Sequence, residues 1–308
     1  MAEPTSKISR FPFFSRMVLF LATNLAVLLL LGFVMRVLGV GRLLSEQGIG
    51  LHLGGLLVFA AVFGMLGSLV SLLMSKRIAL WSTRARVIGR PEGDTQRWLL
   101  ETVHSQARAA GIGNPDVAIW DAPEPNAFAT GARRNAALVA VSTGLLRNMG
   151  RREVEAVLAH EVAHLANGDM ITMALMQGVV NTFVIFLSRA VGMIIDRAVF
   201  RTQRGRGPGY WISVLVLEMI FGVLASILVM WFSRRREYRA DAGGAALAGK
   251  DAMISALQAL QRAQGQPVTL PQNMAALGIR GSRATGLRAL LRTHPDLDDR
   301  IRALDASD

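Results

Sequence analysis

Apolar residues gather in four long runs along this chain of 308 residues. The first two runs carry no charged side chain. All four approach or exceed the roughly 18 to 20 residues that an α-helix needs to cross about 30 Å of hydrocarbon. The pattern therefore predicts two transmembrane helices early in the chain and a second apolar hairpin later. The runs cover residues 17–35, 53–74, 170–188 and 211–232.

The first run follows Lys7, Arg10 and Arg16, as the apolar core of a secretory signal would. It is longer than the usual core of about 7 to 15 residues, and no A-x-A-like cleavage site follows it. We therefore expect an uncleaved membrane anchor.

Each later run meets one charge: Arg189 directly follows the third, and Glu218 lies inside the fourth. A charge within hydrocarbon is costly unless it is paired or reaches the interface. In an antiparallel hairpin the two residues would lie at similar depth. We therefore expect an ion pair between them.

The loop that joins these two runs leaves two arrangements open. Its arginines outnumber Asp196, which disfavours an external loop under the positive-inside bias, so the hairpin could instead stay partly buried in the interface or in protein. Trp211 and Trp231 stand at the two ends of the fourth run, as interfacial anchors do, and favour full spanning. The arginines are Arg197, Arg201, Arg204 and Arg206.

Between the two pairs of runs the pattern becomes that of a soluble domain. Residues 94–113 show helical spacing with an acidic start and a glycine end, and three short segments, 116–122, 126–131 and 136–142, are typical of strands. We expect the last two strands to form a hairpin. A helix is predicted over 151–169, because acidic residues lie in its first turn and Asn-Gly at its end.

After the fourth run the sequence predicts two more helices, over 233–249 and 251–265. A looser region with prolines and glycines follows, and a loop then enters a short helix within 293–305.

These patterns predict alternating membrane and soluble segments, with the soluble parts inside. The expected layout is a cytoplasmic N-terminus (1–16), a first span (17–38), a periplasmic loop (39–52), a second span (53–74), a first cytoplasmic part (75–170), a third span (171–195), a connecting loop (196–210), a fourth span (211–232) and a second cytoplasmic part (233–308).

The formal net charge of +12 raises the question of nucleic-acid binding. The basic residues, however, follow the apolar runs directly, in 76–90 and 234–236, where the positive-inside bias places them. No nucleic-acid recognition motif accompanies them, so we expect a lipid bilayer and no nucleic acid as partner. The chain has no cysteine, so a zinc ion would have to be held by histidine and carboxylate.

The segment HEVAH is the strongest chemical signal in the sequence. His160 and His164 are four positions apart, so on a helix they lie on one face, one turn apart, and can direct ring nitrogens at one zinc ion. Glu161 lies beside them and can take a proton from the attacking water. The alternative is that both histidines are capped or core residues of an amphipathic helix.

A catalytic zinc site typically has three protein ligands, so a third must be found. Glu237 is the best candidate, because Asp241 lies one turn further along the same predicted helix and can accept a ring N–H from a liganding histidine. Alternatively, Glu237 pairs with neighbouring arginines on a solvated face. A shared site requires an even number of spans between HEVAH and Glu237, and the sequence offers two.

Beyond these residues, the chain resembles the HtpX family of bacterial membrane-bound zinc metalloproteases, which are related to the CAAX prenyl proteases. The resemblance runs nearly from end to end. It rests on LLMSKRIAL (72–80), NAFATGARRNAALVAVSTGLL (126–146), EAVLAHEVAHLANGDM (155–170), GVVNTFVIFLSR (178–189), MWFSRRREYRADAG (230–243) and THPDLDDRI (293–301).

The resemblance implies a membrane α-helical protein with an α+β cytoplasmic metalloprotease domain of the gluzincin type. It implies one Zn²⁺ per subunit, with His160, His164 and Glu237 as ligands and Glu161 as general base. Asp241 would be the companion of a liganding histidine. The implied substrates are misfolded or damaged inner-membrane proteins and unfolded polypeptides, cut on the cytoplasmic side under envelope stress, with self-cleavage included.

Two further residues receive roles from the resemblance. Asn126 would contact the substrate backbone, and His294 would help to hold the tetrahedral oxyanion. The family usually reads His-Pro-Pro at the second of these positions, whereas this chain has His294-Pro295-Asp296, which affects the local loop.

Two other functions remain as alternatives. The first is a non-enzymatic four-span transporter or scaffold, which would give no reason to keep NAFATG, HEVAH and REYRAD together. The second is a protease restricted to prenylated or lipidated C-termini. A chain of this length is short for enclosing a large intramembrane chamber, which disfavours it.

Overall fold

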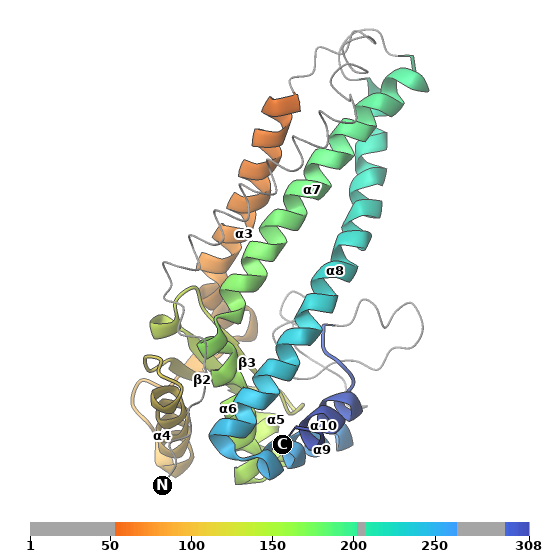
Figure 1. Ribbon diagram of the computed structural model, residues 1–308. Helices are drawn as coiled ribbons and strands as arrows, with labels where there is room; N and C mark the ends of the chain where they lie inside the picture. Colours follow the sequence, from red (N-terminus) through yellow and green to blue (C-terminus); the bar gives the residue numbers. More distant parts are fainter. Residues whose placement is uncertain (1–52, 202–206, 264–292, 308) are drawn as a thin grey trace. The chain divides into compact units, whose positions relative to one another are not determined.

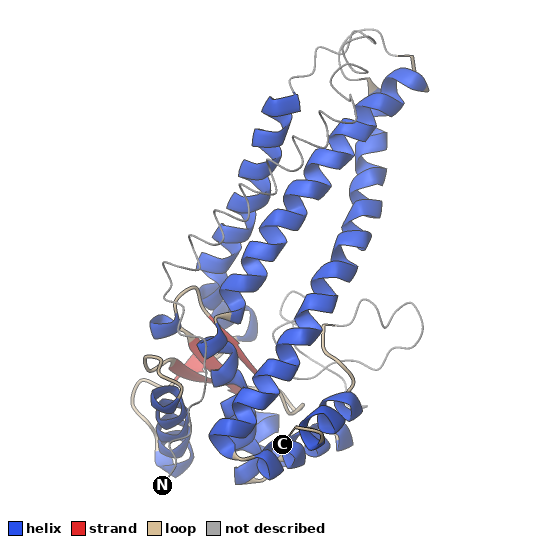
Figure 2. Cartoon of the chain, in the orientation of Figure 1, coloured by secondary structure: helices blue, strands red, loops and turns tan. Residues whose placement is uncertain are grey.

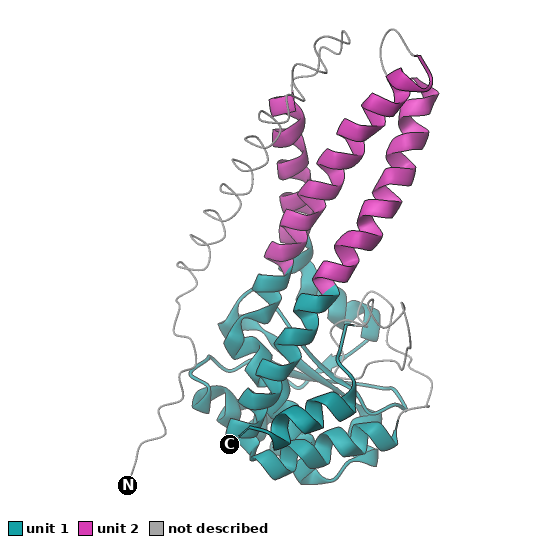
Figure 3. Cartoon of the chain, turned by 45° about the vertical axis from the view of Figure 1, so that its right-hand side comes forward, with its two compact units in different colours: residues 1–8, 71–173, 230–308 teal, residues 9–70, 174–229 magenta. Residues whose placement is uncertain are grey.

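The structure is a computed structural model that describes residues 53–201, 207–263 and 293–307. The predicted first span, 17–38, and the loop 39–52 lie outside the described residues. The described residues form two compact units, one containing residues 71–173 and those from 230 onwards, the other containing residues 53–70 and 174–229 (Figure 3). Most of the described chain is helical, with one small sheet (Figure 2).

Among the described residues, three long helices have the length and composition of membrane spans: α3 (Leu53–Thr83), α7 (Asp169–Ala198) and α8 (Pro208–Ala248) (Figure 1). Two extend well beyond the apolar runs. α3 continues through the basic segment after residue 74. α8 is one helix of 41 residues, roughly 60 Å long, where separate elements were expected on either side of residue 233. Gly243 and Gly244 do not interrupt it.

Within the second unit, glycines bring the helices into close contact. A Cβ on Gly64 of α3 would lie 2.6 Å from the Thr182 backbone nitrogen of α7, and one on Gly192 would lie 2.7 Å from Val214 of α8. Small residues allow such close approach between membrane helices. Many large apolar side chains of α3 and α8 remain exposed, as lipid-facing positions would be.

The predicted ion pair between α7 and α8 is present. Arg189 Nη1 donates to Glu218 Oε1 at 2.7 Å and also to the Ile185 carbonyl, and its guanidinium lies 5.6 Å from the centre of the Phe59 ring. Both charged side chains are partly buried. The pair therefore supplies the partner that a charge among apolar helices requires.

The first unit is built on a four-stranded mixed sheet with strand order β1-β2-β4-β3. Its strands are β1 (Arg86–Val87), β2 (Asp116–Trp120), β3 (Ala127–Thr130) and β4 (Leu138–Ser142). The predicted hairpin is confirmed as the antiparallel pair β3–β4, with a 3₁₀ turn, η1 (Arg134–Ala136), between the strands. β2 pairs with β4 in parallel, which leaves β3 at one edge of the sheet.

Alternate residues of the strands point to two apolar layers. Val117, Val139 and Val141 face a core shared with helices α4 (Gly93–Ala109), α6 (Arg151–Asn167) and α9 (Lys250–Arg262). Ala118, Leu138 and Ala140 face a smaller cluster on the other side, which includes Ala79 of α3. The described part of this unit also contains two short helices, α5 (Thr143–Asn148) and α10 (Leu297–Asp305).

Helix α6 is the central element of this unit and is defined at both ends. The Glu153 carboxylate accepts the Gly150 N–H at the start. At the end, Gly168 adopts a left-handed conformation with φ of 67° and donates to the carbonyls of the last turn. The chain therefore turns sharply and starts α7 at Asp169.

Candidate metal centre

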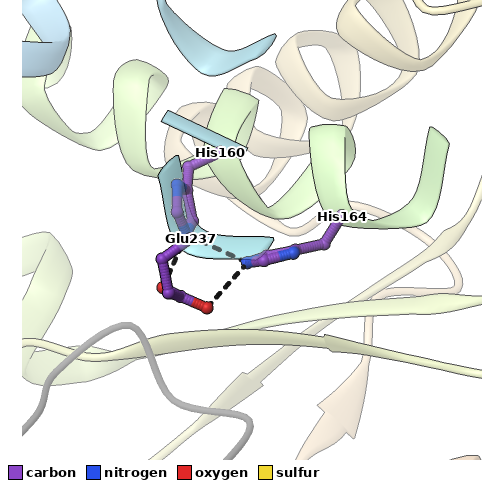
Figure 4. Close-up of side chains that lie close together, drawn as sticks. All are labelled: His160, His164 and Glu237. Carbon is purple, nitrogen blue, oxygen red and sulfur yellow. Dashed lines mark hydrogen bonds and ion pairs between the residues drawn. The ribbon is translucent and has the colours of Figure 1, made fainter. Parts of the chain in front are cut away.

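Three predicted ligands from two helices meet in the first unit. His160 and His164 project from successive turns of α6, and Glu237 comes from α8 (Figure 4). The two Nε2 atoms are 3.1 Å apart. Glu237 Oε2 lies 3.6 Å from His160 Nε2, and Glu237 Oε1 lies 3.4 Å from His164 Nε2. All three side chains are buried, so the solvated alternative for Glu237 is wrong.

These separations suit a metal ion. Ligand atoms about 2.0 to 2.1 Å from a tetrahedral zinc ion lie roughly 3.3 to 3.4 Å from one another. The observed distances of 3.1, 3.4 and 3.6 Å bracket that value. Within the described part of the chain, His160, His164 and Glu237 are the one group of histidine and acidic side chains whose donor atoms converge closely enough to hold a metal ion.

Two glycines allow α8 to approach α6 closely enough to form this site. A Cβ on Gly243 would lie 2.7 Å from the Cβ of Ala163, and a Cβ on Gly244 would lie 3.1 Å from the backbone nitrogen of His160. Larger side chains at these positions would push the helices apart, and Glu237 with them.

Each histidine is oriented by its own carboxylate. Asp241 Oδ1 lies 2.9 Å from His160 Nδ1, as expected for a companion of a liganding histidine, and Asp169 Oδ2 lies 2.7 Å from His164 Nδ1. An ionised carboxylate only accepts, so each Nδ1 carries the proton, and each Nε2 is left to bind a metal.

Sequence reasoning missed Asp169. The available signal in the sequence was Gly168 directly before it. This glycine adopts a left-handed conformation and turns the chain, so that the next residue faces back along α6.

Arg300 of α10 was also missed. Its fully buried guanidinium donates to both oxygens of Asp241, at 2.8 Å from Nε and 2.6 Å from Nη2. Its Nη1 lies 3.6 Å from Glu237 Oε2. The available signal was its place near the end of the segment THPDLDDRI, six residues after His294.

His294 itself reaches the metal centre. Its Nδ1 lies 2.8 Å from Glu237 Oε2, and the side chain is buried. The Asp296 that follows is the N-cap position of α10, so the chain enters a helix here despite the absence of a second proline.

Asn126 lies at the entry to the edge strand β3. Its Oδ1 accepts the Ala127 N–H at 2.9 Å, and its own N–H donates to Ser142 Oγ. The Ser142 N–H donates to the Asn126 carbonyl, so the backbone groups of Asn126 point toward β4. Because these directions alternate along a strand, the backbone groups of Ala127 and Ala129 point toward the free edge of the sheet.

The Ala129 N–H donates to the buried carboxylate of Glu161. This contact connects the edge strand to the residue predicted as general base.

Burial and close carboxylates act in opposition on the two histidines. Burial alone would lower the pKa of His164, but hydrogen bonds to Asp169 and Glu237 outweigh it and raise the pKa to about 10. The pKa of His160 is raised in the same way, against burial, by Asp241 and Glu237. In the metal-free protein, protons therefore compete for the positions that a metal would take.

The two glutamates are shifted in opposite directions. Burial favours the neutral form of Glu237, yet His294 and the hydrogen bonds of His160 and His164 hold its pKa well below the ordinary value. Burial raises the pKa of Glu161, and the nearby histidines offset this only in part. Glu237 is thus suited to remain an anionic ligand, and Glu161 to accept and release a proton.

Similar proteins cover nearly the whole chain. It is 59% identical to Protease HtpX of Thioalkalivibrio sulfidiphilus, over 94% of this chain and 98% of that protein. It is also 59% identical to Protease HtpX of Xanthomonas campestris pv. campestris, over 96% and 98%. A Protease HtpX homolog of Nitrosomonas eutropha is 56% identical over 95% and 99%.

The fold has a solved counterpart in the crystal structure of S. mikatae Ste24p, with a TM-score of 0.57 and 19% identity over 94% of this chain and 67% of that one. The sequence model of peptidase family M48 matches residues 94–308, which include every side chain of the site described above. The chain therefore belongs to peptidase family M48 and, within it, to the HtpX proteases, and it is a membrane metalloprotease.

Proposed function

We propose that the chain is a zinc-dependent endopeptidase that cuts misfolded or damaged inner-membrane proteins on the cytoplasmic side, as part of membrane quality control under stress. The observation that carries this proposal is the buried convergence of His160, His164 and Glu237 at separations that suit zinc, with Glu161 beside them. Two nitrogens and one carboxylate oxygen are a typical donor set of catalytic zinc.

When bound, zinc supplies Lewis acidity and lowers the pKa of water toward about 7. The protein's own residues perform the proton transfers. Glu161 takes the proton of the attacking water and delivers it to the leaving amine, a role that suits a carboxylate whose pKa is raised by burial. His294 donates to the developing oxyanion, and its contact with Glu237 keeps its ring at the centre.

Strand β3 aligns the substrate in this proposal. Its outward backbone groups, at Ala127 and Ala129, can pair with an extended peptide, and Asn126 assists at the strand entry. Backbone pairing depends little on the substrate's side chains, so broad specificity follows, and unfolded polypeptides, including copies of the enzyme itself, become substrates. The Ala129 N–H that bonds Glu161 is then shared with the arriving peptide.

The membrane is part of the proposal through chain connectivity. Glu237 follows the apolar part of α8 by about one and a half turns, and α7 starts at Asp169 beside HEVAH. The basic residues after residue 74 and at 234–236 support an active site on the cytoplasmic face of the inner membrane. Reporter fusions within residues 201–209 test the topology: a cytoplasmic signal there would refute full spanning by α7 and α8.

The activity is tested with the full chain, purified in detergent with zinc, and with Glu161→Gln beside it. We expect the wild type to cleave casein and itself and the variant to retain zinc without cleaving. Glu101→Gln is the matched control, because Glu101 is an exposed glutamate on α4. Equal cleavage by wild type and Glu161→Gln would end the proposal, and cleavage of prenylated peptides alone would favour the narrower protease.

A further inference from the structure

Arg300 is a cation in an unusual place. It is the largest fully buried side chain among the described residues, and a buried guanidinium is costly unless its charge and its N–H groups are matched. Its main partner, Asp241, lies 59 residues earlier on a different helix. Such an arrangement joins α10 to the metal centre by a contact that no local pattern requires.

The contact has two points. Nε donates to Oδ2 and Nη2 to Oδ1, so the flat guanidinium fixes the plane of the flat carboxylate. Oδ1 also accepts from His160 Nδ1. A chain of contacts therefore runs from Arg300 through Asp241 to the ring whose Nε2 faces Glu237 and His164.

Charge gives a second reason for this arginine. Nη1 lies 3.6 Å from Glu237 Oε2, so Arg300 lies between two buried carboxylates. Its Nη2 also approaches His160 Nδ1 at 3.4 Å, and both are donors there, so this approach adds no bond. Without the guanidinium, Asp241 would be a buried anion with one partner, free to turn toward a metal ion or to take a proton.

The other orienting carboxylate lacks this support. Asp169 holds His164 at 2.7 Å, but Arg239 meets it through a single nitrogen at 3.0 Å, and the Arg239 side chain is 59% exposed. The two histidines thus have companions of the same kind with very different anchorage. Arg239 provides a matched comparison within the same site.

We propose that Arg300 is a positioning residue of the metal centre: its two-point contact locks Asp241, Asp241 locks the His160 ring, and the ring presents Nε2 to the metal. Arg300 acts through Asp241 and does not touch the substrate. This inference rests on the proposed metalloprotease site, because a positioned ligand presupposes a metal to bind.

The test measures zinc affinity of the metal-free full chain in detergent, by competition with a chromogenic chelator, beside kcat and KM on casein. For Arg300→Gln we expect zinc affinity to fall about 10- to 100-fold, the usual effect of removing a partner of a liganding histidine, and kcat to fall while KM is kept. Arg300→Lys retains the charge but can contact Asp241 at one point only. Compared with Arg300→Gln, it should therefore fold better and recover only part of the zinc affinity. Arg239→Gln should lose less than about fivefold.

A double variant separates this role from general damage to the fold. Arg300→Gln and Asp241→Asn break the same link, so the double variant should bind zinc about as well as the worse single one. Two results would overturn the proposal. One is a double variant whose loss of zinc affinity is the product of the two single losses. The other is an Arg300→Lys protein with the zinc affinity and kcat of the wild type. If Arg300→Gln does not fold, the zinc affinities and kcat values of Arg300→Lys and Asp241→Asn still test the proposal. Failure of the proposed function appears differently, as a wild type that neither binds zinc nor cleaves.

Discussion

The metal centre and the ion pair between α7 and α8 face the same physical difficulty, because both hold charged side chains away from water. The solutions differ. At the metal centre each charged group has several partners, as Asp241 has both Arg300 and His160. In the second unit, Arg189 and Glu218 form one pair whose side chains remain 24% and 36% exposed. The more deeply buried groups have more partners that can carry the opposite charge, since each lost hydration shell must be replaced.

The difference teaches which charges are required for chemistry. A paired charge between helices can be replaced by apolar side chains of similar volume, whereas the charges of the metal centre cannot, because a metal needs anionic and imidazole donors. Substitutions at the metal centre should therefore change activity and metal affinity, whereas substitutions of the Arg189–Glu218 pair should change stability alone.

The largest effect is expected at Glu161 and Glu237. Glu161→Gln should lower kcat by about 10²- to 10⁴-fold, the usual contribution of a general base, with zinc retained. Glu237→Gln should lose zinc itself, because it replaces an anionic ligand. Zinc content by atomic absorption, measured beside casein cleavage, distinguishes the two. A Glu237→Gln protein with full zinc content would contradict its place among the ligands.

Zinc binding should depend strongly on pH. In the metal-free protein the pKa of His164 is about 10, above its ordinary 6.5, so a proton occupies the ring below that value and zinc must displace it. Apparent zinc affinity should rise with pH between 6.5 and about 10, by up to about tenfold per unit for each proton released. The proton's own stabilisation of the metal-free protein is present below 6.5 and lost as pH rises through 10.

Calorimetry in two buffers of different ionisation enthalpy counts the protons released. Asp169→Asn removes one cause of the raised pKa, so it should flatten the pH dependence. An affinity that does not change with pH would contradict the protonated state of the metal-free site.

A moderate effect is expected where α8 approaches α6. Gly244→Ala places a Cβ 3.1 Å from the His160 nitrogen, so the helices must separate slightly, at a cost of about 1 to 3 kcal/mol and with loss of zinc affinity. Gly222→Ala is the control in the same helix, because nothing lies within 4 Å of its Cβ. It should be neutral or stabilising by about 0.5 kcal/mol. Equal losses from both would mean that helix contact at Gly244 does not position the site.

The smallest effect concerns the Arg189–Glu218 pair. Exchanging the two charges should restore part of the stability lost in each single variant, with a coupling of about 1 kcal/mol in a double-mutant cycle on thermal unfolding in detergent. Zinc affinity should not change in any of these proteins. The absence of rescue by the exchange would show that the contact contributes nothing beyond its individual residues.

Local periodicity was enough for most secondary structure. The strands and the helix with HEVAH lie where their patterns predict, because each depends on neighbours in sequence. Chain order did not reveal that β4 lies between β2 and β3, since alternation marks a strand without naming its partner. The unbroken α8 was missed because the apolar run ends at residue 232 and a basic segment follows, so two separate helices were expected on either side of that change in composition.

The sequence by itself determined His160 and His164 as candidate ligands, with Glu161 beside them, because helical spacing places both histidines on one face, and it made Glu237 a candidate for the third ligand. Asp241 was also predicted as the companion of one histidine, but the other groups that orient the ligands were decided by tertiary structure. Asp169 and Arg300 act across a turn and across 59 residues, through side-chain contacts that leave no periodic trace. Sequence spacing therefore limits which residues can share one face of a helix, whereas tertiary packing decides which side chains contact them.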